Sequence, residues 1–383
     1  MANDIYFTKE HDQVRKALRD FINKEINPYI DEWEEAGIAP LHDIFKKMGD
    51  LGFLGIRFDP KYGGEGLDYW YDTLFLEELG HINSGGVPMA ISVQTHMATP
   101  AIEEFGSEYL KENYLRPALK GDLVGAIAVT EPDAGSDVAG LKTTAKKDGD
   151  SYIINGSKTF ITNGTQADFL TLLARNSDEP GYHSFSLIVV PTNLPGFVIS
   201  KKLDKFGMRS SDTAELFFDN LRVPAENLIG EEGEGFIYQM QQFQHERFSV
   251  MPSCYTRLRD VIDFTIDYMR QRTTFGKPLA ARQVLKHRIA HWVTEIECLK
   301  QLTYHVTRLK IEGVNADKEI SMGKLLAGQL SKDVTDGCLQ IHGGMGYMNE
   351  MRIGRDYRDS RLMGIGGGSD EVMCEIIAKM EGL

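Results

Sequence analysis

The sequence predicts a three-domain α+β protein, because the spacing of its apolar residues changes twice along the chain. Residues 1–120 place apolar side chains at helical spacing, residues 121–232 contain short β-rich runs between turn residues, and residues 233–383 return to helical spacing. We expect an N-terminal helical domain, a middle β-sheet with the form of a barrel or sandwich, and a C-terminal domain like a four-helix bundle. A chain of 383 residues is long enough for more than one core.

Composition and charge argue against several classes of function. The formal net charge is −14, whereas proteins that bind nucleic-acid backbones need an excess of Lys and Arg. No apolar run approaches the roughly 20 residues of a membrane-spanning helix. The four cysteines are scattered, without a C-x-x-C spacing, which predicts reduced structural thiols in an intracellular protein. We therefore expect neither a nucleic-acid partner nor a membrane span.

The N-terminal domain is expected to be built from helices. The first helix should begin after Thr8, a plausible N-cap, and end at Pro28. Its buried face is formed by apolar residues at helical spacing, namely Val14, Leu18, Phe21, Ile22 and Ile26. Further helices are expected over residues 41–51, 69–79, 94–105 and 107–115, with Pro117 as the stop signal.

The middle domain is expected to be a sheet of short strands. Strands are predicted over residues 152–154, 158–162, 169–173 and 184–190, followed by a strand pair within 201–220. Asp148-Gly149, Asn155-Gly156 and Asn163-Gly164 are typical of hairpin turns. After Gly235 the helical spacing returns, with long helices expected over residues 284–312 and 316–339 and a last helix from Asp370.

The hairpin signals predict a small antiparallel sheet, and a polar loop should lie on its rim. A short apolar run over residues 126–129 ends at Thr130, and Gly135-Ser136 follows in the segment TEPDAGSDVAG. Glycine in a turn lets backbone N–H groups approach a ligand closely, and the two hydroxyls add further hydrogen-bonding groups. The pattern alone is equally consistent with an ordinary surface meander.

The amino-acid sequences of two segments favour the ligand-binding interpretation. TEPDAGSDVAG and NGSKTFITNG resemble the flavin-contacting signature of the acyl-CoA dehydrogenases, and the helical, β and helical order resembles that family over the whole length. The resemblance implies α,β-dehydrogenation of an acyl-CoA thioester by an FAD-dependent enzyme. A carboxylate would remove the α-proton, a hydride would pass to flavin N5, and the electrons would go to an electron-transferring flavoprotein.

The identity of the proton-accepting carboxylate is the main departure from the family pattern. Many members carry this Glu near the C-terminus in a Y-E-G-T-type motif, but here Gly366 and Gly367 stand at the Tyr and Glu positions. Long-chain and isovaleryl-CoA enzymes carry the base on the first long C-terminal helix, immediately before an Arg. The matching residue is Glu246 in QHERF. Without the resemblance, a solvated helix Glu in an ion pair would be the better interpretation.

Other substrate contacts are implied by the same resemblance. The backbone N–H of Gly367 would bind the thioester carbonyl, and this donor survives the loss of the side chain. Arg247, Ser136 and Gly366 would contact the substrate, although Arg247 is equally consistent with a surface ion pair.

The resemblance also assigns residues to the flavin in four groups. Ile127, Val129 and Thr130 would lie against the isoalloxazine ring, Gly135 and Ser136 near the pyrophosphate or the CoA, and Phe160 and Thr162 beside N5. Arg272, Thr274, Phe275 and Gln283 match the segment that reaches the FAD of a neighbouring subunit. Gln340, Ile341, Gly343 and Gly344 would lie under the adenine and pyrophosphate, and Ser369 and Glu371 would close the adenosine end. A shared site implies an oligomer, and the family norm is a homotetramer.

Several alternatives and details stay open. An acyl-CoA oxidase is one alternative, although oxidases of this group tend to be longer, and a non-catalytic flavin-binding scaffold is another. The opening segment and GGVPMAISVQTHMATPAI resemble bacterial citronellyl-CoA dehydrogenases, so we expect 3-methyl-branched or long-chain acyl-CoAs to be preferred over butyryl-CoA. The location would be a bacterial cytoplasm, or the mitochondrial matrix if a presequence has been removed. His287 and His291 have metal-ligand spacing but no evident third ligand, so we interpret them as interface or core residues and predict no metal site.

Overall fold

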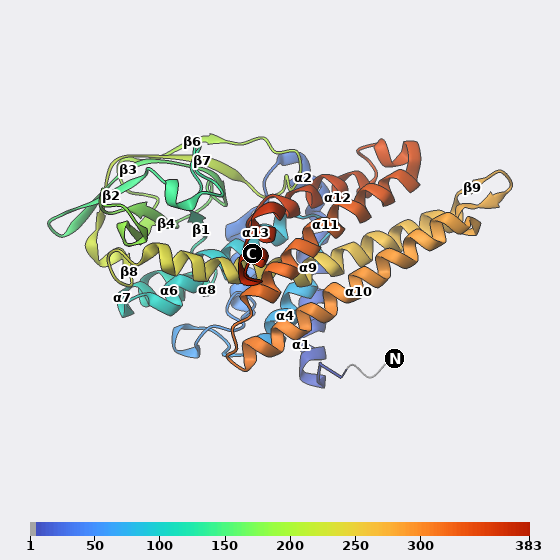
Figure 1. Ribbon diagram of the computed structural model, residues 1–383, viewed down its shortest axis with the longest axis horizontal. Coiled ribbons are helices and arrows are strands. Elements are labelled where there is room, and N and C mark those ends of the chain that lie inside the picture. Colours follow the sequence, from blue (N-terminus) through green and yellow to red (C-terminus); the bar gives the residue numbers. More distant parts are fainter. Residues whose placement is uncertain (1–4) are drawn as a thin grey trace.

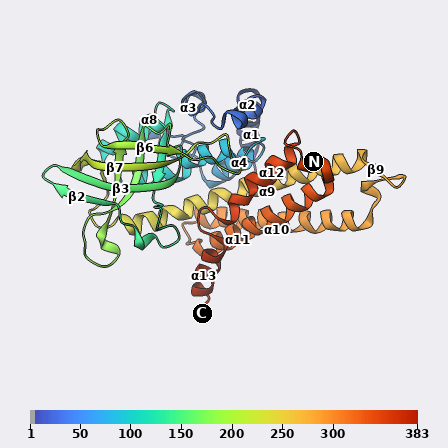
Figure 2. The ribbon, with the colours of Figure 1, turned by 90° about the horizontal axis from the view of Figure 1, so that it is seen from above.

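The computed structural model describes residues 5–383. Figure 1 shows a β-sheet at one end of the molecule, a small hairpin at the other, and long helices running between them. The N-terminal helices lie against these long helices, and the view from above shows α13 and the C-terminus projecting to one side (Figure 2). The observed order of helices, sheet and helices confirms the predicted fold class.

The N-terminal part is helical, with several tight or wide turns between short helices. Its helices are α1 (Lys9–Phe21), α2 (Ile30–Ala36), α3 (Leu41–Asp50), α4 (Tyr69–Leu79), α5 (Gly86–Ser92), α6 (Pro100–Phe105), α7 (Glu108–Leu110) and α8 (Arg116–Leu119). π-helical segments η1 (Ile22–Ile26), η4 (Val93–Ala98) and η5 (Lys111–Leu115) connect some of them.

Three of the expected boundaries in this region were wrong. Pro117 does not stop the helix expected over 107–115, because it lies in the first turn of α8, and the chain stays helical to Leu119. Pro28 does not end the first helical element, because it lies in the first turn of a 3₁₀ segment, where a missing N–H costs nothing, and the chain stays helical to Ala36. The stop is Gly37, whose φ of 68° is left-handed. The helix expected over 94–105 begins earlier, at Gly86, and is broken at Thr99 before Pro100.

The middle part forms a single mixed sheet. Its strands are β1 (Gly125–Ala128), β2 (Thr144–Asp148), β3 (Ser151–Thr162), β4 (Phe169–Arg175), β5 (Phe185–Pro191), β6 (Phe197–Lys202), β7 (Thr213–Pro224) and β8 (Leu228–Ile229). Within the described residues the strand order is β6-β7-β3-β2-β4-β5-β8, and β1 pairs with β4. The β1–β4 and β2–β4 pairs are parallel, so the small sheet expected to be antiparallel around the rim loop is in fact mixed.

Only one of the three predicted hairpin turns forms a hairpin. Asp148-Gly149 joins β2 to β3, with Gly149 at a φ of 63°. Asn155-Gly156 lies inside β3, where the pairing with β7 shifts register, because Gly156 adopts a φ of 143° that suits a β-bulge. Asn163-Gly164 is a turn that ends β3, and the next strand pairs elsewhere in the sheet.

Strand β4 shows how the sheet is packed. Leu170, Leu172 and Ala174 point into a core formed by residues from most strands of the sheet, as expected for a barrel-like form. Phe169 and Leu173 point to the other face, where they pack with residues of α6, α8 and the start of α9. This central strand is therefore buried on both faces, and the helices hold the sheet against the rest of the molecule.

The C-terminal part consists of long helices and a hairpin. The helices are α9 (Gly235–Gln271), α10 (Gln283–Ile311), α11 (Asp317–His342), α12 (Arg352–Ser360) and α13 (Asp370–Met380), and the hairpin is formed by β9 (Thr273–Thr274) and β10 (Lys277–Pro278). Helix α12 was not predicted. The chain changes from helices to strands between α8 and β1, and from strands back to helices between β8 and α9. The domain boundaries at 120/121 and 232/233 stay a prediction.

Two further sequence expectations concern the whole chain. All four cysteines are free, two of them buried. Among the helices of residues 5–383, none combines the length and the apolar character needed to cross a membrane.

Candidate active site

Helix α9 carries Glu246 in its fourth turn, where the helix passes the loop before α13. A Cβ atom built on Gly367 would lie 3.2 Å from Oε1 of Glu246 and 3.6 Å from its Cδ. The carboxylate therefore occupies the space that a side chain at position 367 would enter. Glu246 is partly buried, and no residue among 5–383 forms a hydrogen bond with its carboxylate.

The electrostatic surroundings of Glu246 favour a carboxyl group that takes up a proton readily. Burial raises the pKa of Glu246, and the positive charges of Arg247 and Lys324 offset this rise only in part. A carboxylate without hydrogen-bond donors is less stabilised than one that accepts several N–H groups. The side chain thus combines partial burial, a raised pKa and a free pair of oxygens, as a general base requires.

Two cations hold the glycine-rich loop that faces Glu246. Nε of Arg247 donates to the carbonyl of Gly367 at 3.3 Å. Nζ of Lys324, which is fully buried on α11, donates to the carbonyls of Met363 at 2.6 Å and Gly368 at 2.8 Å. Because its backbone carbonyls are fixed from two helices, this loop is held in a defined position beside the carboxylate. The role of Lys324 was not evident from the sequence, since Lys on a helix is usually exposed.

The glycines of this loop differ in the space that they leave. Gly367 has a φ of 66°, and the volume freed by its missing side chain is filled by Glu246. A Cβ on Gly366 would meet only Leu362, at 3.5 Å, which is an ordinary contact. A Cβ atom at position 367 would therefore press against Glu246, whereas one at position 366 would make an ordinary contact with Leu362.

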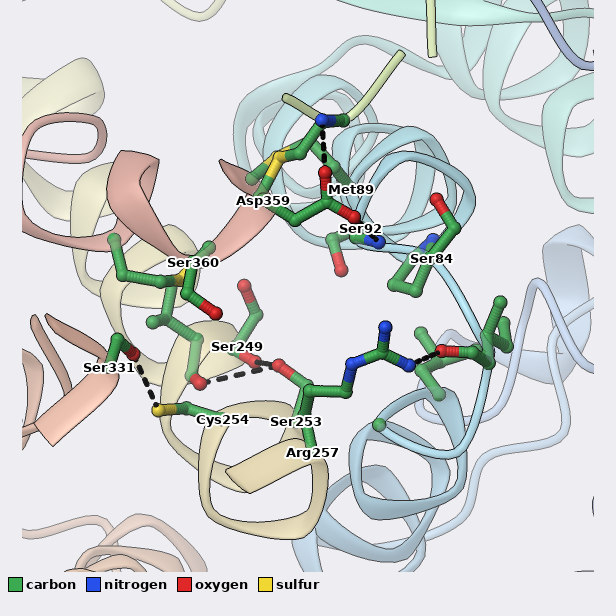
Figure 3. Close-up of a pocket in the computed structure, with 18 of the residues that line it drawn as sticks. Ser84, Met89, Ser92, Ser249, Ser253, Cys254, Arg257, Ser331, Asp359 and Ser360 are labelled. Carbon is green, nitrogen blue, oxygen red and sulfur yellow. Dashed lines mark hydrogen bonds between the residues drawn. The ribbon is translucent and has the colours of Figure 1, made fainter. Parts of the chain in front are cut away.

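A cavity of about 80 Å³ lies along α9 and begins at Ser249, about one helical turn beyond Glu246. On this helix the cavity is lined by pairs of residues from three successive turns, namely Ser249, Val250, Ser253, Cys254, Arg257 and Leu258. Figure 3 shows Met89 and Ser92 of α5 and Asp359 and Ser360 of α12 on other sides of this cavity. Leu258 lies nine residues after Ser249, so the lined stretch of helix measures about 14 Å.

A second group of predicted residues gathers at the rim of the sheet. The N–H of Thr159 donates to the carbonyl of Thr130 at 2.9 Å, which joins the end of β1 to β3. Phe160 has a φ of 59° and a ring that is 68% exposed. The hydroxyls of Thr130, Ser136 and Thr162 have no hydrogen-bond partner among residues 5–383. An exposed aromatic face beside free hydroxyls suits a flat ligand with polar edges.

A buried ion pair fixes this rim. Nζ of Lys158, which is fully buried, donates to the carbonyl of Val129 at 2.8 Å and to Oε1 of Glu131 at 2.9 Å. The Glu131 carboxylate also accepts the N–H groups of Lys142 at 2.7 Å and Thr143 at 2.9 Å. Both ends of the loop are thus tied to one point. The pair lies in the two signature segments, but the sequence did not show that its members meet.

The remaining predicted flavin residues lie in two other places. Ser369 and Glu371 begin α13 near Glu246, and Ser369 caps this helix by accepting the N–H of Val372 at 3.3 Å. The others are at the end of the long helices that is remote from the sheet (Figure 1): Arg272, Thr274 and Phe275 at the β9–β10 hairpin, Gln283 at the start of α10, and Gln340, Ile341, Gly343 and Gly344 at the end of α11. One copy of the chain does not bring these residues to the rim of its own sheet.

Comparisons with known proteins identify the family. Residues 8–122, 126–221 and 233–381 match the N-terminal, middle and C-terminal domains of acyl-CoA dehydrogenase, respectively. The chain belongs to the acyl-CoA dehydrogenase family. It is 38% identical over 382 residues to the mitochondrial long-chain specific acyl-CoA dehydrogenase of Sus scrofa, covering 97% of this chain and 86% of that protein. It is 37% identical to an acyl-CoA dehydrogenase of Bacillus subtilis, covering 98% of both chains.

A solved structure agrees with this assignment. A probable acyl-CoA dehydrogenase of Mycobacterium abscessus superposes with a TM-score of 0.95 at 42% identity, covering 98% of this chain and 100% of that chain. The protein is therefore a flavoprotein oxidoreductase acting on acyl-CoA, with FAD as its cofactor. The exposed Phe160 ring and the free hydroxyls at the rim of the sheet fit such a cofactor.

The structure shows the positions of the two histidines that have metal-ligand spacing. His287 and His291 are both exposed on α10, so the alternative that they are core residues of one chain was wrong. Their alternative place in an interface between copies is untested.

Proposed function

We propose that the protein catalyses the α,β-dehydrogenation of an acyl-CoA thioester with Glu246 as the base that removes the α-proton. The observation that carries this assignment is the position of the Glu246 carboxylate, 3.2 Å from the Cβ site of Gly367. In many family members the base stands at the position of Gly367. A carboxylate on α9 that fills the same space has access to the same substrate atom, and a second one beside it would raise the pKa of both.

The neighbouring groups then have defined roles. The N–H of Gly367 donates to the thioester carbonyl, which stabilises the negative charge that develops on this oxygen when the α-proton leaves. Arg247 holds the carbonyl of Gly367 and thereby fixes the loop that carries this N–H. FAD, when bound, supplies the acceptor for the hydride from the β-carbon. Partial burial keeps water away from Glu246, so that its proton affinity is available for the substrate.

The residues that hold FAD are proposed to come from two copies of the chain. The rim set, Ile127, Val129, Thr130, Gly135, Ser136, Phe160 and Thr162, would hold the flavin ring and pyrophosphate. The remote set at the hairpin and at the end of α11 would reach the FAD of another copy, because it lies at the opposite end of the molecule from the sheet. Phe275 at the hairpin tip is 96% exposed, which supports a partner there. This arrangement favours the homotetramer typical of the family.

The proposed electron acceptor is an electron-transferring flavoprotein, and the proposed substrates are long-chain or 3-methyl-branched acyl-CoAs. The name of the Sus scrofa relative supports a long chain. The cavity that extends about 14 Å along α9 supports it as well. The space beside Gly366 is the part of the loop that supports a branch near the reacting carbons.

The assignment is tested by replacing Glu246 with Gln in the FAD-loaded protein. Loss of a general base typically costs about 10²–10⁴-fold in rate, so we expect kcat with an artificial electron acceptor to fall by about this factor. The matched control is Glu295→Gln on the exposed surface of α10, which should retain wild-type turnover. Near-full activity of Glu246→Gln would show that another residue is the base. Failure of the wild type to bleach its flavin with any acyl-CoA would refute the activity itself.

A further inference from the structure

We propose that the cavity along α9 selects an acyl chain that carries an uncharged oxygen, a hydroxyl or a carbonyl, beyond its middle. This inference rests on the proposed dehydrogenation and names the class of acyl group that it acts on. It is carried by two serine hydroxyls, Ser92 and Ser360, that line the cavity without a partner. A purely hydrocarbon chain would leave both hydroxyls unsatisfied.

The two serines differ from the other hydroxyls of this cavity. Ser92 is 9% exposed and Ser360 is 8% exposed, and neither side chain has a hydrogen-bond partner among residues 5–383. By contrast, Ser253 donates to the carbonyl of Ser249 at 3.2 Å, and Ser331 lies 3.3 Å from the sulfur of Cys254. Neither oxygen is among the fully buried polar atoms that lack a partner, so both hydroxyls are accessible from the cavity and can bond a ligand atom or ordered water there.

The charged groups of the cavity are already paired and therefore favour a neutral chain. Arg257 donates to the carbonyl of Ile82 and to Asp356. Asp359 accepts the N–H groups of Gly85 at 2.8 Å and of Met208 at 2.5 Å. A carboxylate on the acyl chain would face Asp359 without a free cation. Burying an unpaired charge is costly, whereas a hydroxyl or carbonyl would satisfy the serines without adding charge.

The contacts between helices set the level of the serines along the chain. Gln242 of α9 donates to Glu104 of α6, and farther along α9 Arg257 contacts Ile82, so the stretch from 82 to 104 runs antiparallel to α9. Interpolation along this stretch places Ser92 beside Val250, about 6 Å beyond Glu246 along the helix axis. Figure 3 shows Ser360 on the side of the cavity where Ser331 and Cys254 lie, and Cys254 is about one turn beyond Val250 on α9.

That level corresponds to a limited part of the acyl chain. An extended acyl chain advances about 1.2 Å per bond, which is the advance per bond of a fully extended polypeptide backbone. If Glu246 faces the α-carbon, the serines face roughly the seventh to the tenth carbon. The remaining wall is rich in Met89, Met97, Met208 and Met363, whose flexible side chains can adapt to chains of different shape.

The proposal is tested with decanoyl-CoA and with decanoyl-CoA esters that carry a hydroxyl or an oxo group on the seventh, eighth or ninth carbon. Both kcat/KM and the dissociation constant, the latter by titration calorimetry, are measured with the FAD-loaded enzyme. One additional net hydrogen bond is worth about a tenfold difference. We expect at least one oxygenated ester to exceed decanoyl-CoA by about this factor in both measurements. The mono-CoA ester of decanedioic acid should bind more weakly than decanoyl-CoA.

Serine variants identify the source of the preference. In Ser92→Ala/Ser360→Ala the ratio between the oxygenated ester and decanoyl-CoA should fall to about one or below. Ser253→Ala, which removes a hydroxyl already bonded within α9, should leave that ratio as in the wild type. A wild type that prefers decanoyl-CoA to every oxygenated ester would overturn the proposal and show that the serines hold only water. Turnover of none of these esters, decanoyl-CoA included, would instead refute the proposed dehydrogenation.

Discussion

The carboxylates of Glu131 and Glu246 have opposite environments within one protein. Glu131, at the rim of the sheet, is 6% exposed and receives hydrogen bonds from two backbone N–H groups and from Lys158. Burial alone would raise the pKa of Glu131, but the charge of Lys158 and these hydrogen bonds outweigh it and hold the pKa below its ordinary value. Within the part of the chain that the structure describes, no group donates a hydrogen bond to the Glu246 carboxylate, and burial raises its pKa.

The difference separates a structural carboxylate from a reactive one. A carboxylate that accepts three strong hydrogen bonds is stabilised in its ionised form and has little tendency to take a proton. It can therefore fix a loop, as Glu131 does for the segment that faces the cofactor site. A carboxylate with burial but no donors keeps a high proton affinity, which is what proton abstraction needs.

The largest expected effect concerns the structural partner of Glu131. Lys158→Met leaves a buried carboxylate without its counter-ion, and removing one member of a buried pair typically costs about 3–5 kcal/mol of unfolding free energy. We expect a correspondingly lower midpoint in urea unfolding of the FAD-loaded protein. Lys142→Met is the matched control, because Lys142 pairs with Asp133 at 2.9 Å on the surface, with both side chains about three-quarters exposed. Equal effects of the two variants would contradict the structural role of Glu131.

The second prediction moves the reactive carboxylate instead of removing it. Gly367→Glu places a second carboxyl group against Glu246, so one pKa of the pair should rise strongly, and kcat at neutral pH should fall by about tenfold for each unit by which this pKa exceeds the assay pH. Gly367→Ala measures the cost of a side chain at a φ of 66° without the charge. Glu246→Gln/Gly367→Glu should be more active than Glu246→Gln alone, since position 367 then supplies the carboxylate. If this double variant is as inactive as Glu246→Gln, the two positions do not serve the same pocket.

The fold was predictable from the sequence, because helical and strand periodicity are local properties. The misplaced boundaries were decided by tertiary context: Asn155-Gly156 became a β-bulge because β7 pairs along the whole of β3. Helix α12 escaped prediction because it is short and strongly charged, with the sequence RIGRDYRDS.

The candidate site was predictable only as a set of residue types. The resemblance singled out Glu246 and Gly367, and their assignment as base and backbone donor stays a proposal. What the sequence could not show is the three-dimensional pairing: that Lys324 on α11 holds the loop of Gly367, that Lys158 meets Glu131, or that Ser92 and Ser360 face one cavity. Each of these joins residues from elements far apart in the chain, and no local pattern encodes such distances.

The smallest expected effect distinguishes the two carboxylates by the sign of their pH dependence. The folded-state pKa of Glu246 is raised, so its ionisation destabilises the folded protein as pH rises above 4.5, the ordinary value. The unfolding free energy of Glu246→Gln should therefore increase relative to that of the wild type as pH rises from 4.5. Over the same range kcat of the wild type should increase, because the base becomes ionised. The folded-state pKa of Glu131 is lowered, so Glu131 stabilises the protein above its ordinary pKa and this stability is lost as pH falls through the lowered value.

Urea titrations of both Gln variants and of the wild type at a series of pH values check this contrast. Glu131→Gln should lose stability relative to the wild type as pH rises, and Glu246→Gln should do the reverse. The same sign for both variants would mean that Glu246 is stabilised as an anion in the folded protein. In that case its proton affinity would be too low for the role of base, however close it lies to Gly367.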